Sequence, residues 1–153
     1  DEETKEKFWP HVVCEPSQGV ERAFLVFMFD AYCYDKERNN IVLNLNPKLA
    51  PIKAAIFPIV KRNDFEKMAE DIVRDLKKEM YVVYDKSGSI GRRYSRNDEI
   101  GTPYCITIDD DSLKNQDVTI RDRNTKEQKR IKISELKKIL SDLIELRISF
   151  EDL

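Results

Sequence analysis

The basic side chains of this chain concentrate in two stretches, and their surroundings are typical of phosphate binding. Residues 86–96 carry four basic side chains and no acidic one, and residues 121–132 carry six basic against two acidic. In the first stretch, Gly88-Ser89-Ile90-Gly91 directly precedes a predicted helix. The N–H groups exposed at the start of a helix and the guanidinium groups of arginine both bind phosphate oxygens. We therefore predict a phosphate-binding surface at this turn.

The same region holds side chains suited to reading nucleotide bases. Arg92, Arg96 and Glu99 are spaced to share one face of the helix. Single-stranded RNA is recognised by such a mixture of cations, aromatic rings and base-edge acceptors, and a carboxylate accepts a hydrogen bond from the exocyclic amine of cytosine. The alternative is an ordinary solvated face with weakly stabilising ion pairs. The candidates for base contacts are Tyr94 and Tyr104 for stacking, and Asp98 and Glu99 as acceptors.

The turn also matches a second RNA-binding pattern. Gly88-Ser89-Ile90-Gly91 fits the Gly-x-x-Gly loop of a KH module, which clamps the RNA backbone. That loop joins two helices, whereas here a predicted strand at residues 81–84 precedes it. This preceding strand therefore argues against a KH module.

Composition excludes several classes of protein. The net charge of −2, from 27 basic and 29 acidic side chains, excludes a uniformly basic nucleic-acid-binding surface. The longest apolar runs, Ala23–Phe29 and Ala54–Val60, are seven residues each, whereas a membrane-spanning helix needs about 20. His11 is the only histidine and the three cysteines form no Cys-x-x-Cys pair, so no metal site is predicted. Widely spaced, odd-numbered cysteines fit structural thiols in a reducing cytoplasm.

The hydrophobic pattern predicts an α/β fold that would position these side chains. The apolar run at 51–60 is typical of a central buried strand, and the apolar stripe of 64–80 indicates a helix with Asn63 as its N-cap. A strand at 81–84 completes a strand–helix–strand unit with parallel strands. We expect a mixed sheet of about five strands with about three helices. The other predicted elements are strands at 8–14, 41–45, 104–108, 118–122 and 128–133, a helix ending near Ile100 and terminated by Gly101, and a last helix capped by Ser134.

A further helix, predicted from Val20 to about Tyr34, is apolar nearly all round. A helix of this kind requires burial on every side, which a small surface domain does not offer. We expect its partner to be protein outside this chain. A polar connector at 35–40 separates it from the region of the predicted sheet.

Several ordered motifs resemble one family. Residues 15–22, Glu-Pro-Ser-Gln-Gly-Val-Glu-Arg, resemble motif 3 of the class II aminoacyl-tRNA synthetases. The Glu-Pro-Ser opening is similar to the glycyl-tRNA synthetases of the archaeal and eukaryotic type, and the following segments resemble the anticodon-binding domain of that family. Those segments are residues 49–58, 85–94, 98–104 and 118–123, within a resemblance that runs from Val12 to about Leu146.

The resemblance implies a cytoplasmic ligase of protein biosynthesis that uses ATP and Mg²⁺ to attach glycine to its tRNA, and that forms a homodimer. It implies that Arg22 binds the γ-phosphate of ATP, for which a rigid guanidinium fork is suited. It also implies that Glu15, Pro16 and Ser17 bind glycine, because a carboxylate can pair with the substrate ammonium. Glycine has no side chain to grip, so a small anionic pocket selects it by excluding larger amino acids.

Motifs 1 and 2 of that family have no counterpart in these residues. The resemblance therefore implies that residues 1–38 are the C-terminal edge of the class II catalytic domain, with the motif 3 strand and helix, and that residues 39–153 are the anticodon-binding domain. Alone, the chain is expected to be inactive as a ligase, with no catalytic residue, metal or cofactor of its own. Its expected partner is tRNA, not DNA or a membrane.

For the anticodon, the resemblance implies recognition of the two cytosines that glycine anticodons share. The residues expected to contact the tRNA are Arg92, Arg93, Arg96, Glu99, Arg121 and Arg123. An internal salt-bridge cluster is the alternative for residues 121–123. The alternative for the whole chain is a non-catalytic accessory module that binds RNA and reuses the anticodon-binding fold; the presence of Glu15, Ser17 and Arg22 argues against it.

Overall fold

The computed structural model describes residues 1–7, 9 and 14–153. In the described chain, one sheet has five strands in the order β4-β3-β5-β6-β7. β3 pairs in parallel with β4 and β5, whereas β6 and β7 continue the sheet in antiparallel pairing. This confirms the predicted α/β fold with a mixed five-stranded sheet. The strands are β3 (Ala54–Pro58), β4 (Val82–Tyr84), β5 (Tyr104–Ile108), β6 (Asp117–Asp122) and β7 (Gln128–Lys132).

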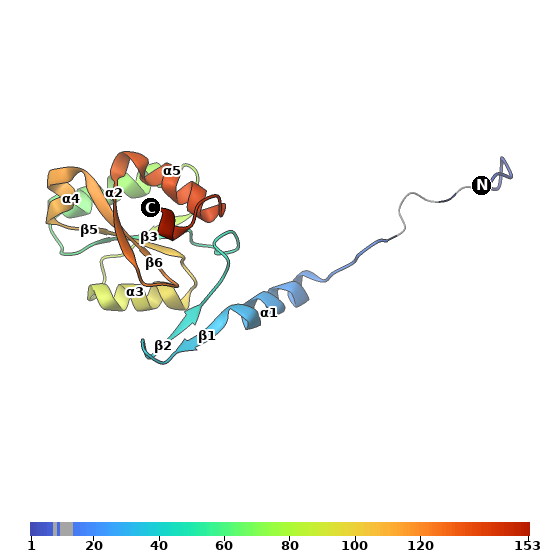
Figure 1. Ribbon diagram of the computed structural model, residues 1–153, viewed down its shortest axis with the longest axis horizontal. Helices are drawn as coiled ribbons and strands as arrows, with labels where there is room; N and C mark the ends of the chain where they lie inside the picture. Colours follow the sequence, from blue (N-terminus) through green and yellow to red (C-terminus); the bar gives the residue numbers. More distant parts are fainter. Residues whose placement is uncertain (8, 10–13) are drawn as a thin grey trace.

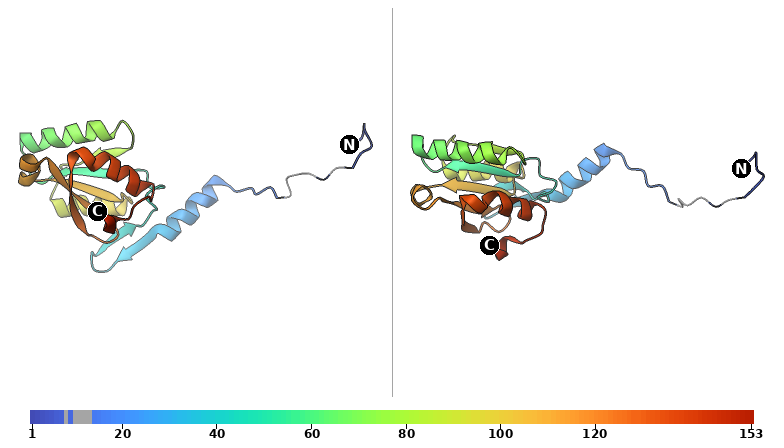
Figure 2. Two further views of the ribbon diagram at one scale, coloured as in Figure 1. Left: turned by 45° about the horizontal axis from the view of Figure 1, so that its top comes forward. Right: turned by 90° about the horizontal axis from the view of Figure 1, so that it is seen from above.

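Helices cover both faces of this sheet (Figures 1 and 2). α2 and α5 pack on one face and build the larger apolar core with Ile56, Ile106 and Ile120 of the sheet. α3 lies on the opposite face, where its Ile90 and Tyr94 pack against the sheet. Successive side chains of a strand point to opposite faces, which is why β3, β4 and β5 contribute to both cores. The helices are α2 (Asn63–Leu76), α3 (Ile90–Glu99), α4 (Asp110–Asn115) and α5 (Ile133–Ile144), and a 3₁₀ turn follows at Phe150–Asp152.

A helix and a hairpin precede the sheet. α1 (Val20–Ala31) leads directly into β1 (Tyr32–Asp35), which pairs antiparallel with β2 (Asn40–Leu43). The prediction of a helix to residue 34 is wrong, because the backbone is extended from Tyr32 and pairs with β2. α1 points away from the body of the sheet (Figure 1). The strand predicted at 8–14 lies outside the described residues, apart from Trp9 and Cys14.

Two predicted helix caps are wrong. α2 includes Asn63 as its first residue, because only Arg62 before it is still extended. α5 begins at Ile133, because β7 runs directly into it and Lys132, rather than Ser134, takes the N-cap position. The predicted strand at 51–60 and the predicted helix at 64–80 are both longer than β3 and α2.

α4 is a short helix that is not among the elements predicted from the sequence pattern. Asp109 accepts a hydrogen bond from the N–H of Ser112 at 2.9 Å, and the Ser112 hydroxyl accepts one from the N–H of Asp109 at 3.1 Å. This reciprocal capping box starts the helix. The acidic triplet at 109–111 is therefore a helix start rather than a plain turn after β5.

The end of α3 confirms the conformation predicted for Gly101. Its φ is +82°, in the left-handed region that favours glycine. A Cβ at this position would lie 3.1 Å from the carbonyl oxygen of Leu43 in β2. The glycine therefore allows the end of α3 to lie directly against the hairpin.

Candidate functional site

Short-range contacts order the predicted phosphate-binding turn. Asp85 accepts a hydrogen bond from the N–H of Ser87 at 2.8 Å, and Ser89 caps α3 by accepting one from the N–H of Arg92 at 3.4 Å. Gly88 has a φ of +77°, which a residue with a side chain would adopt only under strain. The start of α3 is therefore fixed by residues that the sequence places within a few positions of one another.

Arg93 points into the protein and is 3% exposed. Its guanidinium donates to the carbonyl oxygen of Gly88 at 2.8 Å and also to those of Pro58 and Lys86. These contacts tie the turn to the end of β3 and occupy the side chain. They correct the expectation that Arg93 contacts RNA.

The exposed face of α3 carries Arg92, Arg96 and Glu99, at the spacing that the sequence predicts. Arg96 donates to the Asp85 carboxylate and, at 2.7 Å, to the carbonyl oxygen of Ser87. Within the described part of the chain, the side chains of Arg92 and Glu99 have no hydrogen-bond or ion-pair partner. A free guanidinium and a free carboxylate thus lie about two helical turns apart on the same face of α3. This pair could contact a phosphate and the amine of a base.

Arg121 on β6 lies in the interior and is 7% exposed. Both of its terminal nitrogens donate to the Asp98 carboxylate, at 3.0 and 3.1 Å. Its guanidinium also lies 4.6 Å from the ring centre of Tyr94. Burial acts to lower the pKa of Arg121, but the hydrogen bonds to Asp98 and its negative charge outweigh this and raise the pKa above its ordinary value.

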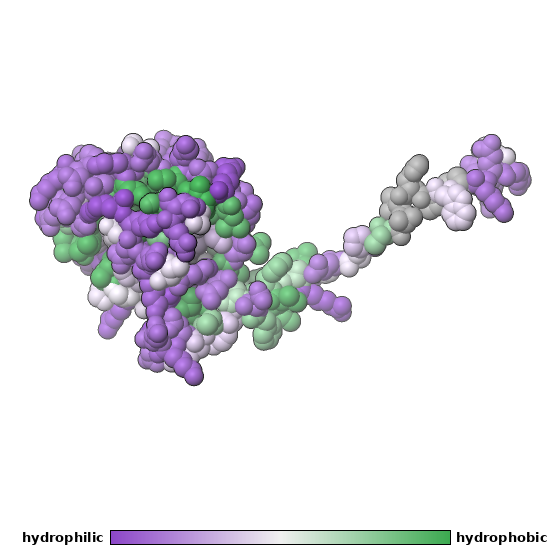
Figure 3. Space-filling model, in the orientation of Figure 1, coloured by the Kyte–Doolittle hydropathy of each residue, from purple (hydrophilic) through white to green (hydrophobic). Residues whose placement is uncertain are grey.

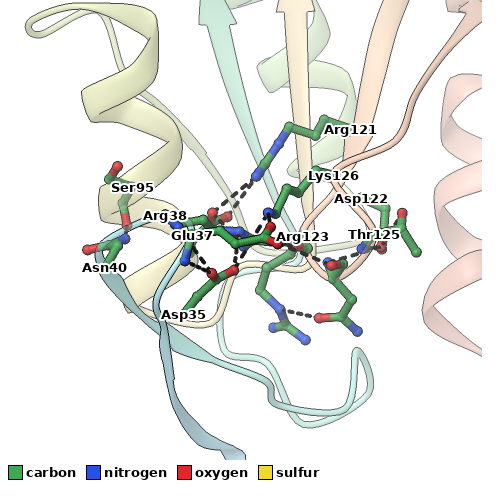
Figure 4. Close-up of polar contacts among 12 residues, drawn as sticks. Asp35, Glu37, Arg38, Asn40, Ser95, Arg121, Asp122, Arg123, Thr125 and Lys126 are labelled. Carbon is green, nitrogen blue, oxygen red and sulfur yellow. Dashed lines mark hydrogen bonds and ion pairs between the residues drawn. The ribbon is translucent and has the colours of Figure 1, made fainter.

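Arg123, just after β6, is still more buried, at 1% exposed. It donates to the carbonyl oxygen of Gly101 at 2.7 Å and to that of Leu45 at 2.8 Å. Burial lowers its pKa from the ordinary value of arginine. Arg121 and Arg123 are therefore both held in the interior (Figure 4), Arg121 by an ion pair with Asp98 and Arg123 by carbonyl oxygens rather than by a salt bridge within residues 121–123.

Two further candidates for base contacts are also buried. Tyr104 is 4% exposed, and its ring stacks on that of Phe150 with the ring centres 6.5 Å apart. Burial raises the pKa of Tyr104 to about 12. Asp98 is 2% exposed and receives hydrogen bonds from two arginines. Both residues belong to the interior of the fold and cannot reach a base.

Carboxylates or carbonyl oxygens from other elements hold the basic side chains of the second stretch. The sequence shows a surplus of positive charge at 121–132, but its exposed members are held by residues distant in the chain. The partners are Glu37 for Lys126, Asp109 for Arg130, the carbonyl oxygen of Glu151 for Lys129, and the carbonyl oxygen of Asn115 together with Asp117 for Lys132. The candidate site therefore contracts to the exposed face of α3.

Sequence reasoning missed Arg38, which lies in the predicted polar connector. Its guanidinium donates to Asp98 at 3.0 Å and to the carbonyl oxygen of Arg123 at 2.8 Å, and so joins the β1–β2 turn to α3 and β6 (Figure 4). No local pattern marks its link to α3 and β6, because Asp98 and Arg123 lie 60 and 85 positions away in the chain.

The four residues predicted to bind ATP and glycine lie on the N-terminal arm. Glu15, Pro16 and Ser17 are exposed in an extended segment, and Arg22 is exposed on the first turn of α1. In the described residues none of their side chains has an ion-pair or hydrogen-bond partner. The structure brings them into one short segment but does not enclose them in a pocket.

α1 exposes most of its apolar side chains, among them Phe24 at 64% and Phe29 at 75%. Figure 3 shows this apolar surface beside the hydrophilic surface of the sheet domain. A groove of about 710 Å³ lies between α1, β2 and the end of α3, and its walls include Phe24, Leu43 and Ile100. These side chains have no cover among the described residues, and a partner for α1 outside this chain stays a prediction.

The described residues contain no group of three or more His, Cys, Asp and Glu side chains that could hold a metal ion. None of the helices in that part of the chain is long and apolar enough to cross a membrane.

Residues 53–143 match the model of a protein family described as "Anticodon binding domain". A protein from Rhodopirellula baltica named glycine–tRNA ligase is 50% identical over 143 residues, which cover 89% of this chain and 26% of the relative. The proteins of the same name from Thermobifida fusca and Clostridium acetobutylicum are 43% and 46% identical over 149 residues, covering 93% and 94% of this chain. The chain spans only about a third or less of the length of these relatives.

Proposed function

Since the chain belongs to the family of anticodon-binding domains, we propose that it recognises the anticodon of a transfer RNA as part of a glycine–tRNA ligase. The names of the relatives support the ligase, and the match over residues 53–143 supports the anticodon as the ligand. The observation that carries the proposal is the exposed face of α3. Arg92, Arg96 and Glu99 lie there on a helix whose opposite side is packed against the sheet.

The chemistry of this face fits the two cytosines of a glycine anticodon. The free Glu99 carboxylate can accept a hydrogen bond from a cytosine amine. The free Arg92 guanidinium and the start of α3 can bind the phosphates beside those bases. Arg96 is held by the Asp85 carboxylate and the carbonyl oxygen of Ser87, so its part on this face is to order the turn beside the free Arg92.

A titration with RNA tests this proposal. The chain is titrated with an RNA hairpin that carries a glycine anticodon and with a hairpin in which uracils replace both cytosines, at several salt concentrations. We expect tighter binding of the first RNA, and affinities that fall as salt rises because phosphate contacts release counterions. Equal affinity for both hairpins would contradict base recognition, and a flat salt dependence would contradict the phosphate contacts.

We further propose that Arg22 binds the γ-phosphate of ATP and that Glu15, Pro16 and Ser17 bind glycine in the whole protein. The free, exposed guanidinium of Arg22 fits a phosphate ligand. No carboxylate cluster suited to Mg²⁺ lies in the described residues, so the ion would be held by another part of the enzyme. A homodimer, a cytoplasmic location and membership of the archaeal and eukaryotic type belong to the same proposal; the three relatives named above are bacterial.

The boundary between the two parts, at residues 38 and 39, also stays a prediction. It falls in the turn between β1 and β2, which are paired with each other. The second candidate function, an accessory module that binds RNA without catalysis, predicts that α1 has no large partner. The exposed apolar side chains of α1 favour the ligase instead.

A pyrophosphate-exchange assay tests whether this chain can activate glycine without the rest of the enzyme. We expect this chain to catalyse no exchange when given ATP, glycine and Mg²⁺, because most of the adenylate site would belong to the remaining two thirds of the enzyme. Measurable exchange would contradict the assignment of this chain as the anticodon-binding part.

A further inference from the structure

Arg38 makes contacts with each of its three guanidinium nitrogens, although it lies before the region that matches the family. Nη1 donates to Asp98 at 3.0 Å, and Nη2 donates to the carbonyl oxygens of Arg123 at 2.8 Å and Asn124 at 3.2 Å. Nε lies 2.8 Å from the carboxylate of Asp35, in the same turn. The side chain is only 13% exposed. Through these contacts, Arg38 connects the β1–β2 hairpin to the sheet domain.

The far end of this connection is a residue of the candidate RNA-binding helix. Asp98 belongs to α3, and its neighbour Glu99 is part of the exposed face. The Asp98 carboxylate receives Arg38 on one side and both terminal nitrogens of Arg121 on the other. The group is nearly balanced in charge, because two arginines meet the carboxylates of Asp98 and Asp35. Removing one member would leave an uncompensated charge in a buried place, which is strongly unfavourable.

The hairpin holds α3 at two more points. The Asn40 amide donates to the carbonyl oxygen of Ser95 at 3.1 Å, in the middle of α3. At the end of the helix, Gly101 lies against Leu43 of β2. α3 is therefore packed between the sheet on one side and the hairpin on another, and only its outer face remains exposed.

From this arrangement we propose that Arg38 is a positioning residue for RNA recognition, which holds α3 in the orientation that its exposed face needs, and that bound RNA in turn stabilises the docked hairpin. The proposal rests on the function proposed above and deepens it. The reciprocal effect is required by linkage, because a docked hairpin that favours RNA binding must itself be favoured by bound RNA. The hairpin directly follows α1, so RNA bound to α3 would also stabilise the position of the segment that leads to the rest of the enzyme.

Hydrogen exchange of the unmodified chain tests the reciprocal effect without any variant. We expect the RNA hairpin with the glycine anticodon to slow the exchange of amides in β1 and β2 and to leave those of α5, on the opposite face of the sheet, unchanged. RNA that binds with no change in β1 and β2 would overturn the proposal and leave the proposed function intact. Absence of RNA binding would overturn the proposed function and the proposal together.

The variant Arg38→Met tests the positioning role, with Arg74→Met as the matched control. Arg74 is an exposed arginine of α2 whose one ion-pair partner among the described residues is Asp71 on its own helix. We expect Arg38→Met to lower the affinity for the glycine anticodon by about tenfold, a typical strength of coupling between sites, and to reduce the discrimination against the uracil hairpin. The salt dependence should not change, because Arg38 reaches no phosphate. Arg74→Met should leave all three quantities unchanged.

Two results would overturn this role. Unchanged affinity and discrimination in a folded Arg38→Met chain would show that α3 needs no such support. A salt dependence reduced by about one counterion would show that Arg38 contacts a phosphate directly. Arg38→Lys should give an intermediate affinity, since lysine keeps the charge beside Asp98 but not the fork that reaches Arg123. If Arg38→Met does not fold, the exchange experiment on the unmodified chain decides alone.

Discussion

The arginines of this chain divide into an interior group and an exposed group, although members of the two are adjacent in sequence. Arg92 and Arg93 are neighbours on α3, where successive residues point about 100° apart. Arg93 turns inward and binds three carbonyl oxygens, whereas Arg92 faces solvent without a partner in the described chain. Arg121 and Arg123 are buried in the interior, as Arg93 is. Positive charge in a sequence therefore marks a candidate RNA-binding surface only where the fold leaves the charge unpaired.

The interior group should govern stability, and Asp98→Asn should show it most strongly. The substitution removes the charge that two guanidinium groups share in a buried site. We expect the free energy of unfolding to fall by about 3–5 kcal/mol, the usual consequence of breaking a buried ion pair on one side. Denaturant unfolding measures this, with Asp71→Asn on the surface of α2 as control. A loss no larger than that of the control would mean that the cluster is not a stabilising unit.

Arg123→Met should have the next largest effect. Methionine fills much of the same space but leaves the carbonyl oxygens of Gly101 and Leu45 buried without these donors. We expect a loss of about 2–3 kcal/mol in the free energy of unfolding. Arg92→Met is the matched control, since it removes an arginine from the exposed group. Equal stability of the two variants would remove the distinction between the groups.

For the exposed group the expected effect is on binding. Arg92→Ala should change the free energy of unfolding by less than about 0.5 kcal/mol, as surface substitutions usually do. The same variant should weaken the binding of both RNA hairpins by a similar factor and reduce the slope of log affinity against log salt by about one. Fluorescence titration at several salt concentrations gives the affinity for each hairpin and the slope of log affinity against log salt. An unchanged slope would show that Arg92 meets no phosphate.

The smallest effect concerns pH. Burial acts to raise the pKa of Asp85, but the hydrogen bonds from Arg96 and from the N–H of Ser87 outweigh it and lower the pKa below the ordinary 3.8. A lowered carboxyl pKa stabilises the fold above the unfolded value, and this stability is lost as the pH falls through the folded value. Asp85→Asn should remove this contribution, so that the variant loses less stability between pH 5 and the acid range. We expect less than about 1 kcal/mol, because the pair is partly exposed. Identical acid profiles would contradict the role of Asp85.

The sequence predicts the elements of the sheet domain well, because their signals are local. The strand at 104–108 has the predicted bounds, and Gly101 has the predicted left-handed conformation. The helix over residues 32–34 is wrong, since pairing of β1 with β2 overrides an apolar pattern that continues through Tyr34. α4 was missed even though its capping residues are present in the sequence.

The candidate site was predicted only in part. The common face of Arg92, Arg96 and Glu99 follows from helical spacing and is confirmed as an exposed face. The interior positions of Arg121 and Arg123 depend on partners that lie far away in the chain, such as Asp98 and Leu45. Arg38 carries no local signal at all, because its role exists only once the hairpin docks on α3. Long-range pairing is what a pattern of charges along one sequence does not reveal.

A double-mutant cycle between Glu99 and the anticodon tests the central claim most directly. The chain and its Glu99→Ala variant are each titrated with the cytosine hairpin and with the uracil hairpin. We expect Glu99→Ala to weaken binding of the cytosine RNA by about 1–3 kcal/mol and to leave binding of the uracil RNA unchanged, because uracil has no exocyclic amine to donate to the carboxylate. Equal losses for the two RNAs would show that the exposed face of α3 does not read the anticodon.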